Sequence, residues 1–259
     1  MSTSMELAGG KILAGIADGV GRVVFNQPEK RNAMSVDMWE GMGQALDRFA
    51  EDAAVRCVVL QGAGDKAFVS GADISQFEQN RANADAQREY DRLTGAGRAR
   101  LSAFPKPVIA QIRGFCMGGG LGIAMSTDIR IASDDSQFGI PAAKLGIAYG
   151  FDMVRALVSL VGPAHAHMIL MTGERFDARE AERIGLVNKV VPVAELEATV
   201  ARLTATLAVN APLSLRTNKM TVKAVLQDPA DREMGAIRAA MAGCFDSNAS
   251  HKSSPVPSL

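Results

Sequence analysis

Short apolar runs and longer helical stripes alternate along the first two thirds of the chain. Two apolar runs flank Asp18-Gly19, a pair typical of a tight hairpin turn between two strands. Residues 35–50 carry apolar side chains at helical spacing and follow Ser35, the expected N-cap. This predicted helical stripe consists of Val36, Met38, Trp39, Met42, Leu46 and Phe49.

The remaining elements follow from the same two periodicities. Strands are predicted over residues 55–61, 108–112, 129–132, 137–139 and 187–191. Helices are predicted over residues 154–161, 164–171, 178–184, 192–209 and 213–245, the last broken near Pro229. The polar residues 75–102 predict one or two surface helices. The order predicts an α/β fold with a core domain over residues 1–195 and a helical C-terminal region over 196–259, which ends in a polar tail.

The composition is that of an ordinary globular protein, with 47 % hydrophobic and 22 % charged residues among 259. Lys plus Arg and Asp plus Glu each number 28, so no net charge favours nucleic acid or an anionic membrane as a partner. The three scattered cysteines argue against a disulfide framework, and no metal-ligand spacing is present. No signal peptide is recognised, and no apolar run approaches the roughly 20 residues of a membrane span, so a cytoplasmic protein is expected.

Two segments rich in small residues stand out, residues 66–74 (KAFVSGADI) and residues 114–122 (GFCMGGGLG). Each follows a predicted strand, and the second leads into a short helix. Small residues let a ligand approach the backbone, and a turn that enters a helix points free N–H groups outward. Two such turns that face each other would form an oxyanion hole.

Six segments together, in this order and spacing, resemble the enoyl-CoA hydratase/isomerase (crotonase) family over nearly the whole chain. They are residues 26–34 (NQPEKRNAM), 68–74, 114–122, 128–132 (DIRIA), 138–141 (FGIP) and 185–192 (GLVNKVVP). The resemblance implies a crotonase-like spiral of ββα units with a helical C-terminal trimerisation region. It also implies a homotrimer or a hexamer and an acyl-CoA substrate, with no tightly bound cofactor. The oxyanion N–H groups would belong to Ala72 and Gly119.

The resemblance also implies a set of positions that contact coenzyme A. Lys30 and Arg31 could pair with its phosphates, although both could equally belong to a solvated loop. Asp73 could instead cap a following helix. The full set of implied coenzyme A positions is Lys30, Arg31, Ala33, Gly71, Asp73, Ile74 and Gly118.

The chain departs from the family at the two glutamates that hydratases use as general acid and base. Gly122 and Ala142 stand at these positions, and neither can transfer a proton. Tyr149 and Asp152, in the loop that follows, are the candidate replacements. A pocket wall is the alternative role for Tyr149, and a helix cap is the alternative for Asp152.

Three functions follow from these residues. The favoured one is an acyl-CoA lyase or isomerase that stabilises an enolate, with Asp152 as the proton carrier. An acyl-CoA decarboxylase and a non-catalytic acyl-CoA-binding protein are the alternatives, since both need little acid–base help from side chains.

Overall fold

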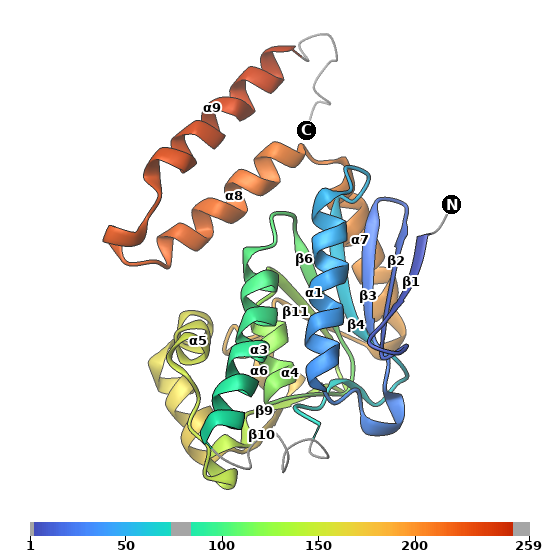
Figure 1. Cartoon of the computed structure of the whole chain (residues 1–259), viewed down its shortest axis with the longest axis vertical. Coiled ribbons are helices and arrows are strands. Elements are labelled where there is room, and N and C mark those ends of the chain that lie inside the picture. The colour runs from blue at the N-terminus through green and yellow to red at the C-terminus, as the bar shows by residue number, and fades with distance from the viewer. Residues whose placement is uncertain (1–2, 74–83, 251–259) are drawn as a thin grey trace.

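The structure is a computed structural model that describes residues 3–73 and 84–250, and it contains two sheets (Figure 1). The larger sheet has seven strands in the order β1-β2-β3-β4-β6-β8-β11. These are β1 (Thr3–Leu7), β2 (Ile12–Ala17), β3 (Val20–Phe25), β4 (Cys57–Gly62), β6 (Val108–Ile112), β8 (Ile129–Ser133) and β11 (Lys189–Val191). The smaller sheet has the order β10-β9-β7-β5, formed by β10 (Arg175–Asp177), β9 (Gln137–Gly139), β7 (Phe115–Met117) and β5 (Ala67–Val69).

The predicted hairpin is confirmed as the antiparallel pair β2 and β3. Asp18 and Gly19 both have positive φ, 51° and 76°, as a two-residue hairpin turn of the primed type requires. Strand β1, which was not predicted, pairs antiparallel with β2 at the edge of the sheet. From β3 to β11 all neighbouring strands are parallel, so the sheet is buried on both faces there.

Helices cover the two faces of the larger sheet, and β4 shows which helices cover which face. Val58 and Leu60 belong to the main core with α1 (Val36–Glu51) and α3 (Ala84–Ala103). Val59, between them, faces the opposite way and packs with α7 (Leu196–Val209). Each large apolar side chain buried in this way contributes roughly 1.5–3 kcal/mol to folding.

The predicted helices are present in the described residues, with some shifted ends, while the start of the helical stretch predicted over 75–102 lies outside them. Helix α6 covers Ala178–Arg183, and α7 begins at Leu196 because a 3-10 turn occupies Val193–Glu195. The two helices predicted over 154–161 and 164–171 form α5 (Phe151–Thr172), which Gly162 and Pro163 divide at a non-helical φ of 72°. Contrary to the sequence-based expectation, α5 is long and apolar enough, by length and composition alone, to cross a membrane, and 22 % of its most apolar 18-residue window is buried within the chain.

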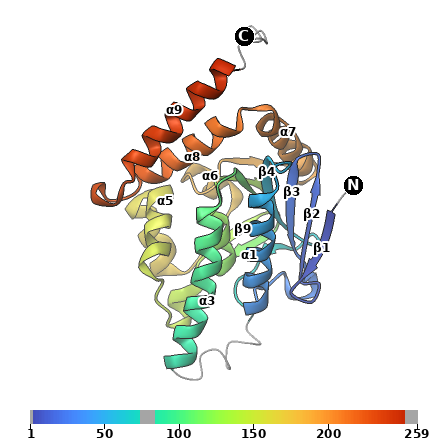
Figure 2. The same ribbon diagram turned by 45° about the horizontal axis from the view of Figure 1, so that its top comes forward.

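The C-terminal helices α8 (Pro212–Val225) and α9 (Met234–Ser250) pack on each other and project away from the two sheets (Figures 1 and 2). The expected break at Pro229 is confirmed by a short 3-10 turn between them. The polar tail was expected from residue 247, whereas α9 continues to Ser250, and residues 251–259 lie outside the described part. The separation into domains at residue 195 stays a prediction.

One buried lysine joins α8 to the core. The Lys219 ammonium donates to Asp128 Oδ2 at 2.6 Å and to the carbonyl of Lys106 at 2.8 Å. Asp128 also accepts the backbone N–H of Val108, so the carboxylate ties α8 to the first residue of β6. Burial lowers the pKa of Lys219 and the Asp128 carboxylate opposes that shift. The Asp128 carboxylate thus offsets part of the cost of burying the Lys219 ammonium.

Candidate active site

The first N–H of the expected oxyanion hole belongs to the segment that follows β5. The N–H of Met34 donates to the carbonyl of Gly71 at 2.8 Å, and the N–H of Asp73 donates to the carbonyl of Met34 at 2.9 Å. In an extended segment successive N–H groups point to opposite sides, so the N–H of Ala72 points away from Met34. Within the described residues no backbone hydrogen bond takes up the N–H of Ala72.

The second N–H belongs to the turn between β7 and α4 (Gly119–Met125). The N–H of Gly118 is taken by the carbonyl of Gly139 at 2.9 Å, and its φ of 50° turns the chain into the helix. Gly119 is the first residue of α4, where an N–H has no partner inside the helix. A β-carbon on Gly119 would lie 3.9 Å from the nitrogen of Ala72. The two expected donors are therefore neighbours.

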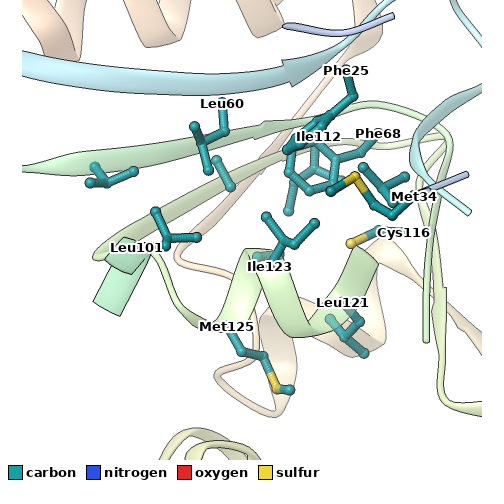
Figure 3. Packing of buried hydrophobic residues seen from close by; sticks show 14 of the residues in the cluster. Phe25, Met34, Leu60, Phe68, Leu101, Ile112, Cys116, Leu121, Ile123 and Met125 are labelled. Atoms are coloured by element: carbon teal, nitrogen blue, oxygen red, sulfur yellow. The ribbon is translucent and has the colours of Figure 1, made fainter. Parts of the chain in front are cut away.

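The expected donor of Gly119 lies at the start of α4, which packs on the main hydrophobic core. Figure 3 shows Leu121, Ile123 and Met125 of α4 among buried side chains from the surrounding strands. Above Ile123 the rings of Phe25 and Phe68 meet edge to face, with 5.5 Å between their centroids. Donors on such a buried frame keep their positions during a reaction, as electrostatic catalysis requires.

The implied coenzyme A positions surround the same segment. Lys30 donates to Asp73 Oδ2 at 2.8 Å, and the Asp73 side chain is only 8 % exposed. The carbonyl of Arg31 accepts the N–H of Ser70 at 3.1 Å, which holds this loop beside Gly71. Ala33 is buried here as well. Ile74 lies outside the described residues, and the coenzyme A roles stay predictions.

Gly122 and Ala142, the positions at which the resemblance led us to expect the family's two glutamates, carry no carboxylate. Gly122 is buried in α4, and a β-carbon there would lie 2.4 Å from Cε of Met153. Met153 therefore fills the space that a side chain at position 122 would need. Ala142 is buried at 7 % exposure in the 3-10 turn Pro141–Leu145. Sequence reasoning missed Met153, because only the folded chain brings α5 against α4.

The two candidate replacements lie in different surroundings. Tyr149 packs against the main core, and its hydroxyl lies 3.8 Å from where a β-carbon on Gly118 would stand. Asp152 lies in the first turn of α5, whose N-cap is Gly150, so Asp152 is not the cap. Its side chain is 89 % exposed and lies 3.7 Å from Arg155. Tyr149, rather than Asp152, thus lies beside Gly118, the residue before the expected donor Gly119.

The buried thiols of β4 and β7 are poorly suited to act as nucleophiles. Cys116 is fully buried in β7, and burial raises the pKa of its thiol far above the ordinary range. Burial likewise raises the pKa of Cys57 to about 11. Both thiols stay protonated and unreactive at neutral pH. In the part of the chain that is described, no group of three His, Cys, Asp or Glu residues could hold a metal ion.

Comparison with known proteins agrees with this geometry. Residues 15–256 match the family Enoyl-CoA hydratase/isomerase. A short-chain-enoyl-CoA hydratase of Clostridium acetobutylicum is 38 % identical over 223 residues, which cover 86 % of this chain and 85 % of the relative. A hydroxycinnamoyl-CoA hydratase-lyase of Pseudomonas fluorescens is 33 % identical over 207 residues, which cover 79 % of this chain and 75 % of the relative.

Solved structures show the same fold. A crystal structure of an enoyl-CoA hydratase/carnitine racemase from Magnetospirillum magneticum superposes with a TM-score of 0.85 at 34 % identity and covers 93 % of this chain and 88 % of that one. The expected crotonase-like α/β fold is thereby confirmed. The chain belongs to the enoyl-CoA hydratase/isomerase (crotonase) family, whose enzymes act on acyl-CoA thioesters, and it is an enzyme of that kind.

Proposed function

We propose that this enzyme is an acyl-CoA lyase or isomerase that works without the two-glutamate acid–base pair. The observation that carries the proposal is the pair of neighbouring N–H groups of Ala72 and Gly119, beside which positions 122 and 142 offer no carboxylate. Two donors on the thioester oxygen stabilise the negative charge that develops when an enolate forms. Proton transfer then depends on another side chain.

Tyr149 is the side chain best placed for that role. Its hydroxyl lies beside Gly118, one residue before the Gly119 donor, and its ring is held by the core. A tyrosine hydroxyl is protonated at neutral pH and can donate a proton to a departing or migrating group. Asp152, exposed in the first turn of α5, would reach the hole only after a rearrangement of that turn.

Turnover of a panel of unsaturated, 3-hydroxyacyl and malonyl-type CoA thioesters tests the proposal. Tyr149→Phe keeps the ring and removes the hydroxyl, so kcat should fall by about 10²–10⁴, as for the loss of a general acid or base. Asp152→Asn is the matched control and should leave kcat near the wild-type value. Equal kcat for Tyr149→Phe and wild type on the best thioester would exclude Tyr149 from the mechanism.

A decarboxylase is the second candidate, and the contact between Met153 and Gly122 favours it. An apolar side chain in the place of a glutamate suits the loss of carbon dioxide, which leaves an enolate without removal of a proton by a base. Carbon dioxide release from malonyl-type thioesters would support the decarboxylase function. Tight thioester binding without turnover of any member of the panel would instead indicate a non-catalytic acyl-CoA-binding protein.

We also propose that the chain assembles as a homotrimer or as a hexamer formed by two trimers. The C-terminal helices leave large apolar side chains in solvent, more than a monomer usually exposes in one region. These side chains are Val222, Val225, Leu226, Met234, Met241 and Phe245. Sedimentation equilibrium should give three or six times the chain mass of 27.3 kDa, and a monomer at micromolar concentration would refute the assembly.

A further inference from the structure

Met153, in the first turn of α5, lies against the face of α4 that begins at Gly119. A β-carbon on Gly122 would lie 2.4 Å from Cε of Met153 and 3.3 Å from its sulfur, so the end of the methionine side chain touches α4 at this residue. Gly119 and Gly122 are three residues apart in α4, and residues at this spacing are neighbours on one helix face, with about 5–6 Å between β-carbons. The end of Met153 therefore lies close to the N–H that we propose as a donor to the thioester oxygen.

Tyr149 continues the wall that Met153 forms beside α4. Its hydroxyl lies 3.8 Å from where a β-carbon on Gly118 would stand. Tyr149 and Met153 both pack against the main core, and both are half-buried, so each keeps part of its surface open to a ligand. The residues of α4 and its turn that meet them, Gly118 and Gly122, carry no side chains. The space beside Gly119 is therefore bounded by the side chains of Tyr149 and Met153.

The two sides of the expected oxyanion hole differ in polarity. On the side of Ala72, the carbonyl of Arg31 accepts the N–H of Ser70, which places a loop with an exposed guanidinium there. On the side of Gly119, the half-buried Met153 offers apolar surface. An acyl chain gains free energy from contact with apolar surface, whereas the phosphates of coenzyme A favour cations. The acyl group of a thioester bound in the hole is therefore expected to extend toward Met153.

We propose that Met153 determines the size of the acyl group that this enzyme accepts. The proposal rests on the proposed function, in which the thioester carbonyl lies between the N–H groups of Ala72 and Gly119. Met153 then leaves room for a short, unbranched acyl chain and excludes a chain that carries a branch or a ring at its third carbon. Because methionine is unbranched and has three rotatable bonds, a new side chain at position 122 would push its end toward the acyl group.

Isothermal calorimetry with the saturated thioesters butanoyl-CoA, 3-methylbutanoyl-CoA and 3-phenylpropanoyl-CoA tests the role of Met153. Met153→Ala removes Cγ, Sδ and Cε, so the Kd of 3-phenylpropanoyl-CoA should fall at least about tenfold, since each carbon newly buried is worth about fourfold in affinity. The Kd of butanoyl-CoA should rise about fourfold because a contact is lost, and that of free coenzyme A should not change. Met168→Ala is the matched control, because Met168 lies in the same helix and is 62 % exposed; it should bind every ligand as wild type does.

Gly122→Ala tests the same wall from the opposite side. Within 4 Å the added β-carbon would meet only the flexible end of Met153, so the fold should tolerate the change while the methionine is displaced toward the acyl group. The Kd of butanoyl-CoA should rise about tenfold in Gly122→Ala. The double variant Gly122→Ala/Met153→Ala should bind butanoyl-CoA as Met153→Ala does. Effects of the two substitutions that simply multiply would show that Met153 does not lie between position 122 and the ligand.

Binding and turnover separate this proposal from the proposed reaction. Wild-type Kd values for all three thioesters in Met153→Ala would overturn the role of Met153, even with normal thioester turnover. Equal affinity of the wild type for butanoyl-CoA and 3-phenylpropanoyl-CoA would overturn it as well. The expected shifts in Kd, together with no turnover of any unsaturated, 3-hydroxyacyl or malonyl-type thioester, would instead refute the reaction and leave Met153 as the residue that determines acyl size.

Discussion

Gly119→Pro is expected to lower kcat by about 10²–10³ on the best thioester of the panel, because it removes one donor of the oxyanion hole. The proline substitution should leave the surrounding backbone unchanged, for two reasons. Gly119 is the first residue of α4, a position where proline is common because its φ suits the helix and the N–H has no helical partner. Gly118, the preceding residue, is not in the α region that a following proline disfavours.

Gly119→Ala is the matched control, because alanine keeps the N–H. A β-carbon at this position would make contacts no closer than 3.9 Å, so no clash is expected. Steady-state kinetics and thermal unfolding of both variants separate catalysis from folding. A proline variant that is as stable as wild type and equally fast would show that the N–H of Gly119 does not stabilise the reaction.

Gly120→Ala is expected to lower the stability of the fold strongly. A β-carbon on Gly120 would lie 2.1 Å from the carbonyl oxygen of Val69 and 2.7 Å from its β-carbon. The nearest obstacle is backbone, so α4 and β5 would have to separate. Overpacking of this kind costs about 3 kcal/mol, and Tm falls by roughly 2–4 °C for each kcal/mol in a chain of this size.

The separation would also displace Ala72, which follows β5, so kcat should fall together with stability in the Gly120→Ala variant. Gly95→Ala in α3 is the control, because a β-carbon there meets nothing within 4 Å and alanine favours a helix. Differential scanning calorimetry compares the two. An unchanged Tm for Gly120→Ala would mean that α4 and β5 are not packed as closely as described.

Local patterns predicted most of the fold, because apolar periodicity and turn residues act over a few positions. The strand predicted over 108–112 is β6, and that over 137–139 is β9, each with the observed bounds. The edge strand β1 was missed since its segment mixes polar and apolar residues, and pairing with β2 decides its conformation. The end of α9 was misplaced because Ser and Asn near a chain end suggest a tail.

The candidate site likewise contains features that the sequence predicts and features that depend on tertiary packing. The segments around Ala72 and Gly119 were predictable, because small residues at a strand end and a helix start mark free N–H groups. The contact of Met153 with position 122 was not, because it joins two helices whose distance depends on tertiary packing. The exposure of Asp152 was hidden for the same reason.

The proposed donors of the hole are peptide groups, which every residue except proline carries. The identity of the side chains at positions 72 and 119 therefore matters only for the room they leave, while the fold supplies the polarising groups. Side chains around the bound acyl group, such as those at positions 122, 142 and 149, can therefore be substituted while the backbone keeps its hydrogen bonds to the thioester oxygen. Diversity of reaction on one unchanged backbone is the natural consequence.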